Sequence, residues 1–89
     1  MRAIVTVIGK DRVGIIANVC TMLSERQINV LDISQTVMQD YFTMIMMVDT
    51  SACNQDFSTI VTDLAKAGEE MGLNIHAQRE DIFNAMHRI

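Results

Sequence analysis

Residues 9–15, with the sequence Gly-Lys-Asp-Arg-Val-Gly-Ile, combine residue types that suit the binding of a small charged ligand. They join an apolar run at residues 3–8 to a segment with helical periodicity. A helix that begins after a short glycine-bracketed loop leaves backbone N–H groups free to receive a carboxylate or phosphate. Asp11 adds an acid that can cap the helix or hold a cation. The loop therefore predicts a notch that suits an anionic group.

Other residues of this loop and one residue beyond it are further candidates for ligand contact. Gly14 has no Cβ, which permits close approach by a ligand or by neighbouring backbone. Asn29 is expected to sit beside the loop across the sheet edge, where its amide can donate and accept hydrogen bonds to a ligand. The alternative is a turn residue after Gln27 whose hydrogen bonds are satisfied within the protein. Lys10 and Arg12 can bind an anionic group or remain solvated. The predicted ligand-binding residues are Asp11, Arg12, Val13, Gly14, Ile15 and Asn29.

The sequence offers no arrangement of residues that suits catalysis, a metal or a cofactor. It has no nucleophile–base pair, no G-x-x-x-x-G-K phosphate loop and no paired carboxylates beside a substrate-binding pattern. His76 and His87 stand apart from other metal ligands, whereas a metal site needs three or four converging groups. We therefore expect a protein that is not an enzyme and that uses no metal ion or cofactor.

The composition limits the kinds of partner that the chain is expected to bind and the cellular compartment in which it is expected to lie. The net charge of −4, with seven scattered basic residues, argues against direct nucleic-acid binding. No apolar run approaches the roughly 20 residues of a membrane span. Two cysteines without metal-ligand spacing indicate reduced thiols and a cytoplasmic protein. The 89 residues are 49% hydrophobic, which is more than one thin core can hide, so an oligomer is expected.

Hydrophobic periodicity predicts two helices among four strands. The strands are expected at residues 3–8, 28–38, 42–49 and 73–79, and the helices at 13–26 and 57–71. The first strand is apolar on both faces apart from Thr6, which predicts cover on both faces. Asn54 or Ser51 is the expected cap of the second helix, and Gly72 ends that helix. The buried stripe of the first helix is expected to contain Ile16, Val19, Cys20 and Leu23.

This order predicts an α+β, ferredoxin-like βαββαβ fold, in which a four-stranded antiparallel sheet carries both helices on one face. The strand at 42–49 is apolar on both faces, so the other sheet face also needs a cover. A second protomer or the C-terminal tail could supply it. The tail shows a helical stripe of Ile82, Phe83, Met86 and Ile89 with Asp81 at a cap position, although a frayed terminus is the alternative. We expect one domain over residues 1–89, with residues 80–89 as a docking tail, in cis or in trans.

The loop D-R-x-G-I, followed after one helix by Ile28-Asn29-Val30, resembles the ACT domain family of small regulatory ligand-binding modules. The resemblance covers nearly the whole chain. In length and pattern the chain resembles small stand-alone ACT proteins, which are similar to the halves of the glycine-cleavage-system transcriptional repressor. It implies a ferredoxin-like fold that binds amino acids at a subunit interface. In many ACT domains a proline precedes the loop glycine; Val13 stands there in this chain, which makes the loop less rigid.

The resemblance implies a non-catalytic regulatory module that binds a small effector, an amino acid, at a homodimer interface and modulates a partner protein. Side-by-side dimers of the family often join edge strands into one eight-stranded sheet, with the loop and Asn29 meeting at the seam. The main alternative is a protein–protein interaction module without a small ligand. A small enzyme on the same fold, such as an acylphosphatase, would rely on Arg12 and Asn29. An RNA-binding domain would need more aromatic residues than this chain has.

Overall fold

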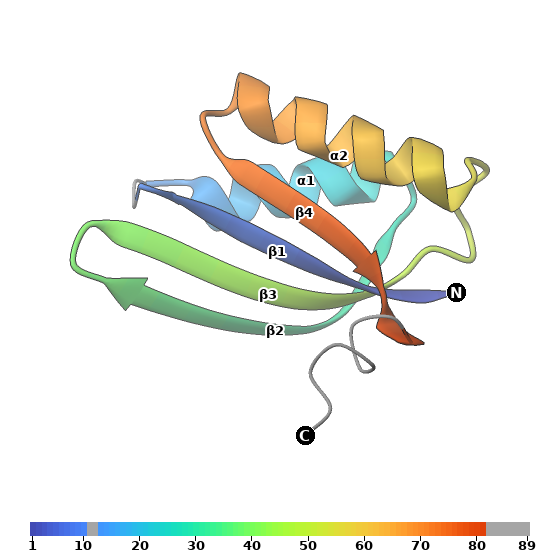
Figure 1. Cartoon of the computed structure of the whole chain (residues 1–89), viewed down its shortest axis with the longest axis horizontal. Coiled ribbons are helices and arrows are strands. Elements are labelled where there is room, and N and C mark those ends of the chain that lie inside the picture. Colours follow the sequence, from blue (N-terminus) through green and yellow to red (C-terminus); the bar gives the residue numbers. More distant parts are fainter. Residues whose placement is uncertain (11–12, 82–89) are drawn as a thin grey trace.

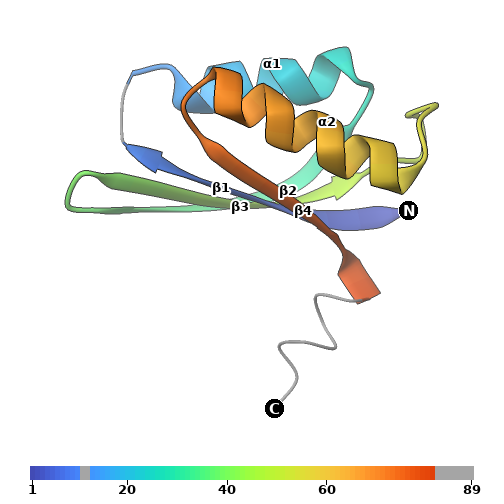
Figure 2. The ribbon, with the colours of Figure 1, turned by 45° about the horizontal axis from the view of Figure 1, so that its top comes forward.

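The computed structural model describes residues 1–10 and 13–81 and shows a single antiparallel sheet with both helices on one face (Figures 1 and 2). Its strands are in the spatial order β2-β3-β1-β4. The elements along the chain are β1 (Arg2–Lys10), α1 (Ile15–Glu25), β2 (Asn29–Met38), β3 (Tyr41–Asp49), α2 (Phe57–Glu70) and β4 (Asn74–Arg79). This is the predicted ferredoxin-like βαββαβ fold, and every predicted strand is confirmed to within two residues at each end.

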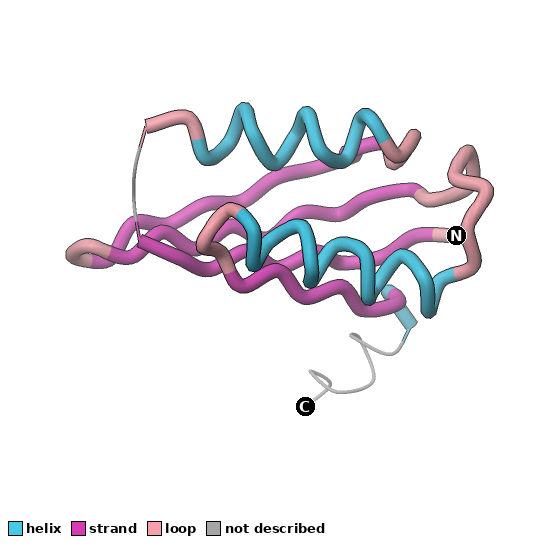
Figure 3. Tube along the Cα trace, turned by 90° about the horizontal axis from the view of Figure 1, so that it is seen from above, coloured by secondary structure: helices cyan, strands magenta, loops and turns pink. Residues whose placement is uncertain are grey.

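The two helices divide the sheet between them. Seen from above, α1 lies on the side of β2, and α2 lies above β4 (Figure 3). β2 and β4 are the two edge strands, whereas β1 pairs with both β3 and β4. β2 also carries a bulge between Val30 and Asp32. The edge at β2 is therefore flanked by α1, and no strand among the described residues pairs with it.

The core lies between the sheet and the helices and follows from alternation along the strands. In β3, Met44, Met46 and Val48 are all buried on the helix side, while Ile45 points to the other face and is 42% exposed. β4 alternates as predicted, with Ile75 and Ala77 inward. Because residues two apart share a face of a strand, alternating sequences of this kind determine which side of the sheet is buried.

The first helix begins later than predicted, and its buried stripe is shifted by one residue. Gly14 has a left-handed backbone (φ 88°), which a right-handed helix cannot include, so the helix starts at Ile15 rather than at residue 13. Ile16 was expected inside but is 39% exposed. Cys20 is only half-buried. Because residues 15 and 16 are both isoleucine, either one could begin the buried stripe of the helix. In the structure the buried residues are Ile15, Val19, Met22 and Leu23.

The predicted cap of the second helix was wrong. Asp56 is the N-cap residue, and its carboxylate accepts hydrogen bonds from the Thr59 backbone N–H (3.0 Å) and from the Ser58 hydroxyl (3.2 Å). Asn54 and Ser51 precede this position, so neither residue begins the helix. The Asp-x-x-Thr spacing directly before the apolar stripe was the available signal, since an N-cap side chain binds the N–H group three residues on.

Both helices end with the same hydrogen-bonded turn but with different residues at its left-handed position. After α2, Gly72 (φ 72°) takes this position, which confirms that it ends the helix. After α1, Gln27 has φ 59° at the equivalent place. The Ile28 N–H there binds the Leu23 carbonyl at 3.0 Å, as the Leu73 N–H binds the Gly68 carbonyl at 2.8 Å. A side chain in this conformation is strained, so Gln27 carries a cost that Gly72 avoids.

The substitution Gln27→Gly is expected to raise the free energy of unfolding by about 0.5–1 kcal/mol, because glycine takes a positive φ without steric cost. The reciprocal substitution Gly72→Gln should lower it by about 1 kcal/mol at the matching position. Urea unfolding followed by circular dichroism measures both values. Equal stability of Gln27→Gly and the wild type would contradict the idea that Gln27 is strained.

The sheet face opposite the helices is only partly covered, contrary to the expectation that β1 is enclosed on both faces. Ala3, Val5 and Val7 of β1 are buried beneath the helices, whereas Ile8 on the other face is 44% exposed. The helix that the tail pattern predicted falls at residues 82–89, outside the described residues.

Candidate functional site

The start of α1 lies at the end of the sheet where β1 finishes. Gly14 is the N-cap residue, and no side chain of the described residues caps the helix there. The first intrahelical hydrogen bond runs from the Asn18 N–H to the Gly14 carbonyl (2.9 Å). The N–H groups of the first turn therefore have no acceptor within the helix. Of the predicted site residues, Ile15 is buried and Val13 is fully exposed, while Asp11 and Arg12 lie outside the described residues.

Glycine is required at position 14 by its backbone angle rather than by crowding. A Cβ added there would have the Asn18 Nδ2 as its nearest atom, at 3.9 Å, which is an ordinary contact distance. The left-handed φ of 88° is the reason for glycine, since other L-residues rarely adopt it. Among the described residues beyond its two chain neighbours, no other atom lies within 4 Å of that Cβ position.

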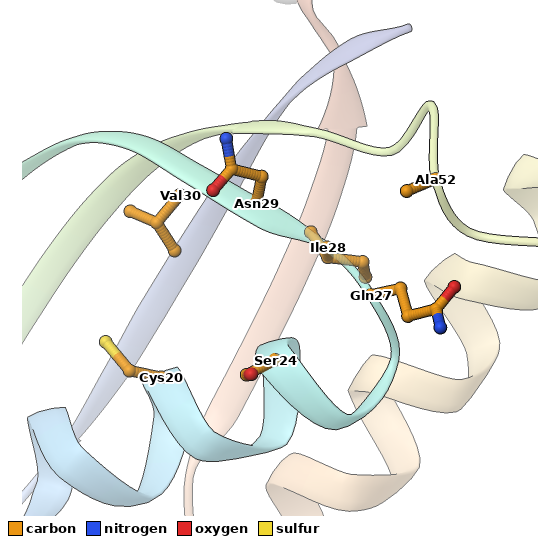
Figure 4. Close-up of a pocket in the computed structure, with 7 residues that line it drawn as sticks. All are labelled: Cys20, Ser24, Gln27, Ile28, Asn29, Val30 and Ala52. Atoms are coloured by element: carbon orange, nitrogen blue, oxygen red, sulfur yellow. The ribbon is translucent and has the colours of Figure 1, made fainter.

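Asn29 lies at the other end of α1, beside a surface pocket of about 580 Å³. Figure 4 shows Cys20 and Val30 pointing toward one another across the gap between α1 and β2. The Asn29 amide points away from α1, so a ligand in the pocket meets the backbone of Asn29 unless its side chain turns. The pocket is lined by Cys20, Ser24, Gln27, Ile28, Asn29, Val30 and Ala52.

Within one chain the loop and Asn29 do not meet, which corrects the expectation that Asn29 sits beside the loop. The strand register pairs Lys10 with Tyr41 at one end of the sheet and Asn29 with Asp49 at the other. Figure 1 shows the same separation, with the start of α1 near the β2–β3 hairpin and the start of β2 at the opposite end. The 11 residues of α1 place its two ends roughly 16 Å apart along the helix axis.

Sequence reasoning missed three polar residues of the pocket, Cys20, Ser24 and Gln27. Cys20 was assigned to the core, but it lines the pocket together with Ser24 one helical turn later. Their spacing of four residues places both on one side of α1, and that was the available signal. The left-handed conformation of Gln27 gave no such signal, because only the packed helix end imposes it.

An ion pair between the two helices holds the end of α1 that frames this pocket. The Arg26 Nε donates to Asp63 Oδ2 (2.5 Å), and Nη2 lies 3.4 Å from Oδ1. Arg26 Nη1 also donates to the Met22 carbonyl (3.0 Å), one of the last carbonyls of α1. The hydrogen bonds from Arg26 lower the pKa of Asp63 below its ordinary value. The pair therefore links α2 to the turn that carries Gln27.

The substitution Asp63→Asn is expected to destabilise the chain at neutral pH and to matter progressively less in acid. Asp63 has a folded-state pKa below its ordinary value of 3.8, so its ionised form contributes stability above that value. This contribution is lost as the pH falls through the lower folded-state pKa. Urea unfolding between about pH 6 and pH 2 measures the difference between the two proteins. A difference that stays constant over this range would contradict the role given to the ion pair.

The described part of the chain brings together no group of three His, Cys, Asp or Glu side chains that could hold a metal ion. Among the same residues, no helix has the length and apolar character needed to cross a membrane. The features that remain as a candidate site are the start of α1, which no side chain of the described residues caps, and the pocket at the other end of this helix.

Comparison with known proteins places this fold in a family. An ACT domain model matches residues 2–78. A UPF0237 protein of Listeria innocua is 54% identical over 89 residues, which is 100% of both chains. The solved structure of an ACT domain protein from Streptococcus pneumoniae superposes with a TM-score of 0.83 at 41% identity, covering 98% of each chain.

One further match is more distant and shows the fold alone. The crystal structure of a putative glycine cleavage system transcriptional repressor superposes with a TM-score of 0.69 at 22% identity. The match covers 86% of this chain and 44% of the repressor, in line with the expected likeness to one half of such a protein. ACT domains are typically regulatory and ligand-binding. From its sequence, its fold and these relatives, the chain belongs to the ACT domain family.

Proposed function

We propose that the chain is a non-catalytic regulatory module that binds a small effector, an amino acid, between the two copies of a homodimer. One copy contributes the loop and helix start, and the other contributes the pocket beside Asn29. Occupancy of the site changes the affinity of the dimer for a partner protein. The residues proposed to contact the effector are Asp11, Arg12, Val13, Gly14 and Ile15 of one copy and Asn29 of the other.

The separation of the two half-sites within one chain carries this proposal. β2 is an edge strand, and nine of its ten residues are exposed. Pairing of β2 with the β2 of a second copy about a two-fold axis reverses the direction of the strand. Since α1 runs alongside β2 in the opposite direction, the same operation brings Gly14 of one copy toward Asn29 of the other. Exposed apolar side chains of β2 support burial at this edge: Leu31, Ile33, Val37 and Met38.

The chemistry of the two half-sites suits an α-amino acid. The free N–H groups at the start of α1 can receive the α-carboxylate, and the helix dipole favours a negative charge there. Asp11 can accept the α-ammonium group. The pocket of the second copy offers the Ser24 hydroxyl and the Gln27 amide to a small polar side chain. An effector that binds the dimer in one arrangement better than in another shifts the equilibrium toward that arrangement.

A thermal-shift panel of the twenty amino acids at millimolar concentration tests effector binding. One small amino acid is expected to raise the Tm of the wild type, because a ligand that binds only the folded chain stabilises it. Asp11→Ala should abolish the shift, and Asn29→Ala should abolish it as well, because the proposed site requires the Asn29 side chain to turn toward the effector. The absence of any shift across the panel would overturn the effector proposal.

Mixing two inactive variants tests whether the site forms between chains. Asp11→Ala disables the loop, and Ser24→Leu fills the pocket with an apolar side chain. In a mixed dimer one of the two sites is intact, so about a quarter of wild-type binding should return when the variants are mixed equally. A site formed within one chain would give no recovery. Isothermal titration with the amino acid found in the panel measures the number of sites.

The same open edge also favours the alternative of a protein–protein interaction module without a small ligand. A partner strand could pair with the exposed β2 in place of a second copy. This alternative predicts no amino-acid shift and tight binding of a partner protein that Ile33→Glu abolishes. We place the module in the cytoplasm, and the two free thiols of Cys20 and Cys53 support this.

A further inference from the structure

The turns that follow the two helices allow Gln27 to be compared with a glycine in the same chain. After α1, the Gln27 N–H binds the Ser24 carbonyl at 2.9 Å. After α2, the Gly72 N–H binds the Glu69 carbonyl at 3.0 Å. The turn therefore needs only a backbone N–H at its left-handed position, and glycine supplies this group without the steric cost that a side chain brings.

The surroundings of Gln27 offer a reason for a side chain that the turn does not use. Gln27 is exposed and lines the pocket of about 580 Å³ between α1 and β2. In Figure 4 its side chain lies on the side of Ala52, and Cys20 and Val30 lie at the other end of the pocket. Strained residues concentrate at functional sites, where the side chain compensates for the cost of its backbone. Its place at the pocket therefore indicates that Gln27 contacts a ligand.

The side chains around this pocket are neutral. Among the described residues, none of those that line it is Asp, Glu, Lys, Arg or His. Arg26, which precedes Gln27, is paired with Asp63. A charged side chain of an effector would lose water in the pocket without gaining an opposite charge. An apolar one would cover the Ser24 hydroxyl and the Gln27 amide without offering them a hydrogen bond. The pocket thus favours a neutral side chain that forms hydrogen bonds.

We propose that Gln27 is a specificity-determining residue of the effector site and selects an amino acid with a carboxamide side chain, asparagine or glutamine. This inference rests on the proposed function, in which the pocket receives the side chain of the effector. A primary amide has both a donor group and an acceptor, so two such amides can pair through two hydrogen bonds. An ionised carboxylate only accepts, so it can pair with the donor half of the Gln27 amide alone.

Isothermal titration of the full-length protein with two pairs of free amino acids tests the selection. Asparagine and aspartate have nearly the same shape, and so do glutamine and glutamate, so each pair differs mainly in the group that meets Gln27. The wild type should bind at least one of the two amides about tenfold more tightly than the matching carboxylate. Equal affinity within both pairs would overturn the inference.

Three variants test whether Gln27 is the residue that selects. Gln27→Gly keeps the turn and removes the amide, so the preference should fall below about threefold even though this variant is expected to be the more stable protein. A purely structural role would change the stability and leave the preference intact. Gln27→Lys offers an ammonium group and should reverse the preference, with the carboxylate bound about tenfold more tightly. Gly72→Lys adds the same charge at the equivalent turn after α2 and should keep the preference of the wild type.

Failure of this inference can be distinguished from failure of the proposed function. Binding of an amide whose preference over its carboxylate is the same in the wild type and in Gln27→Gly would overturn the inference alone. The same holds if only amino acids without a carboxamide side chain bind. If none of the twenty amino acids binds the wild type, the proposed function is overturned, and the inference fails with it.

Discussion

Replacement of Leu64 with alanine is expected to lower the free energy of unfolding by about 2–5 kcal/mol. Leu64 lies on α2, is 1% exposed and belongs to the core cluster between the helices and the sheet. The substitution removes buried apolar surface and leaves a cavity that the surrounding side chains fill only in part. A domain of this size is stable by about 5–15 kcal/mol, so the change removes a large share of its stability.

Urea unfolding followed by circular dichroism measures this loss. Lys66→Ala is the control, because Lys66 is exposed on the same helix and alanine is also a good helix former. It should change the free energy of unfolding by less than about 0.5 kcal/mol. A loss below about 1 kcal/mol for Leu64→Ala would mean that α2 does not pack on the sheet as described.

The substitution Ile33→Glu is expected to weaken the proposed dimer by at least about a hundredfold. Ile33 is near the middle of β2 and is 40% exposed at the open edge. In an antiparallel pair of β2 strands, the two-fold axis brings the middle of one strand beside the middle of the other. Two carboxylates would then lie close together, and like charges across such a pair cost several kcal/mol.

Sedimentation velocity over a range of protein concentrations measures the change in association. Thr62→Glu adds the same charge to the exposed side of α2 and should leave the dimer intact. Circular dichroism should show that Ile33→Glu remains folded as a monomer. The amino-acid thermal shift should disappear together with the dimer. A dimer as stable as the wild type would place the interface elsewhere than at β2.

Local patterns were sufficient for the elements and for the family. Alternation along β3 and β4 predicted which side chains point inward, because the period of a strand is set by its backbone. Gly72 marked the end of α2, since glycine takes the left-handed position without cost. The D-R-x-G-I loop and the Ile-Asn-Val that follows one helix identified the ACT family.

Packing decided details that local patterns left open. Ile15 and Ile16 could each begin the buried stripe of α1. Only the packing of the helix on the sheet determined that Ile15 is buried and Ile16 is exposed. The cap of α2 depended on the residue at which the chain turns into the helix, and that residue is Asp56. Cys20 lines the pocket because the turn after α1 holds β2 across from that side of the helix.

By itself the sequence determined the loop, the strand that carries Asn29 and the identity of the candidate ligand groups, because each depends on residues adjacent in the chain. Only the tertiary structure decided that Gly14 and Asn29 lie at opposite ends of α1. The distance between two residues joined by a helix depends on the path of the backbone, and the residue types alone do not determine that path. This separation is the physical reason for proposing a site that two chains complete together.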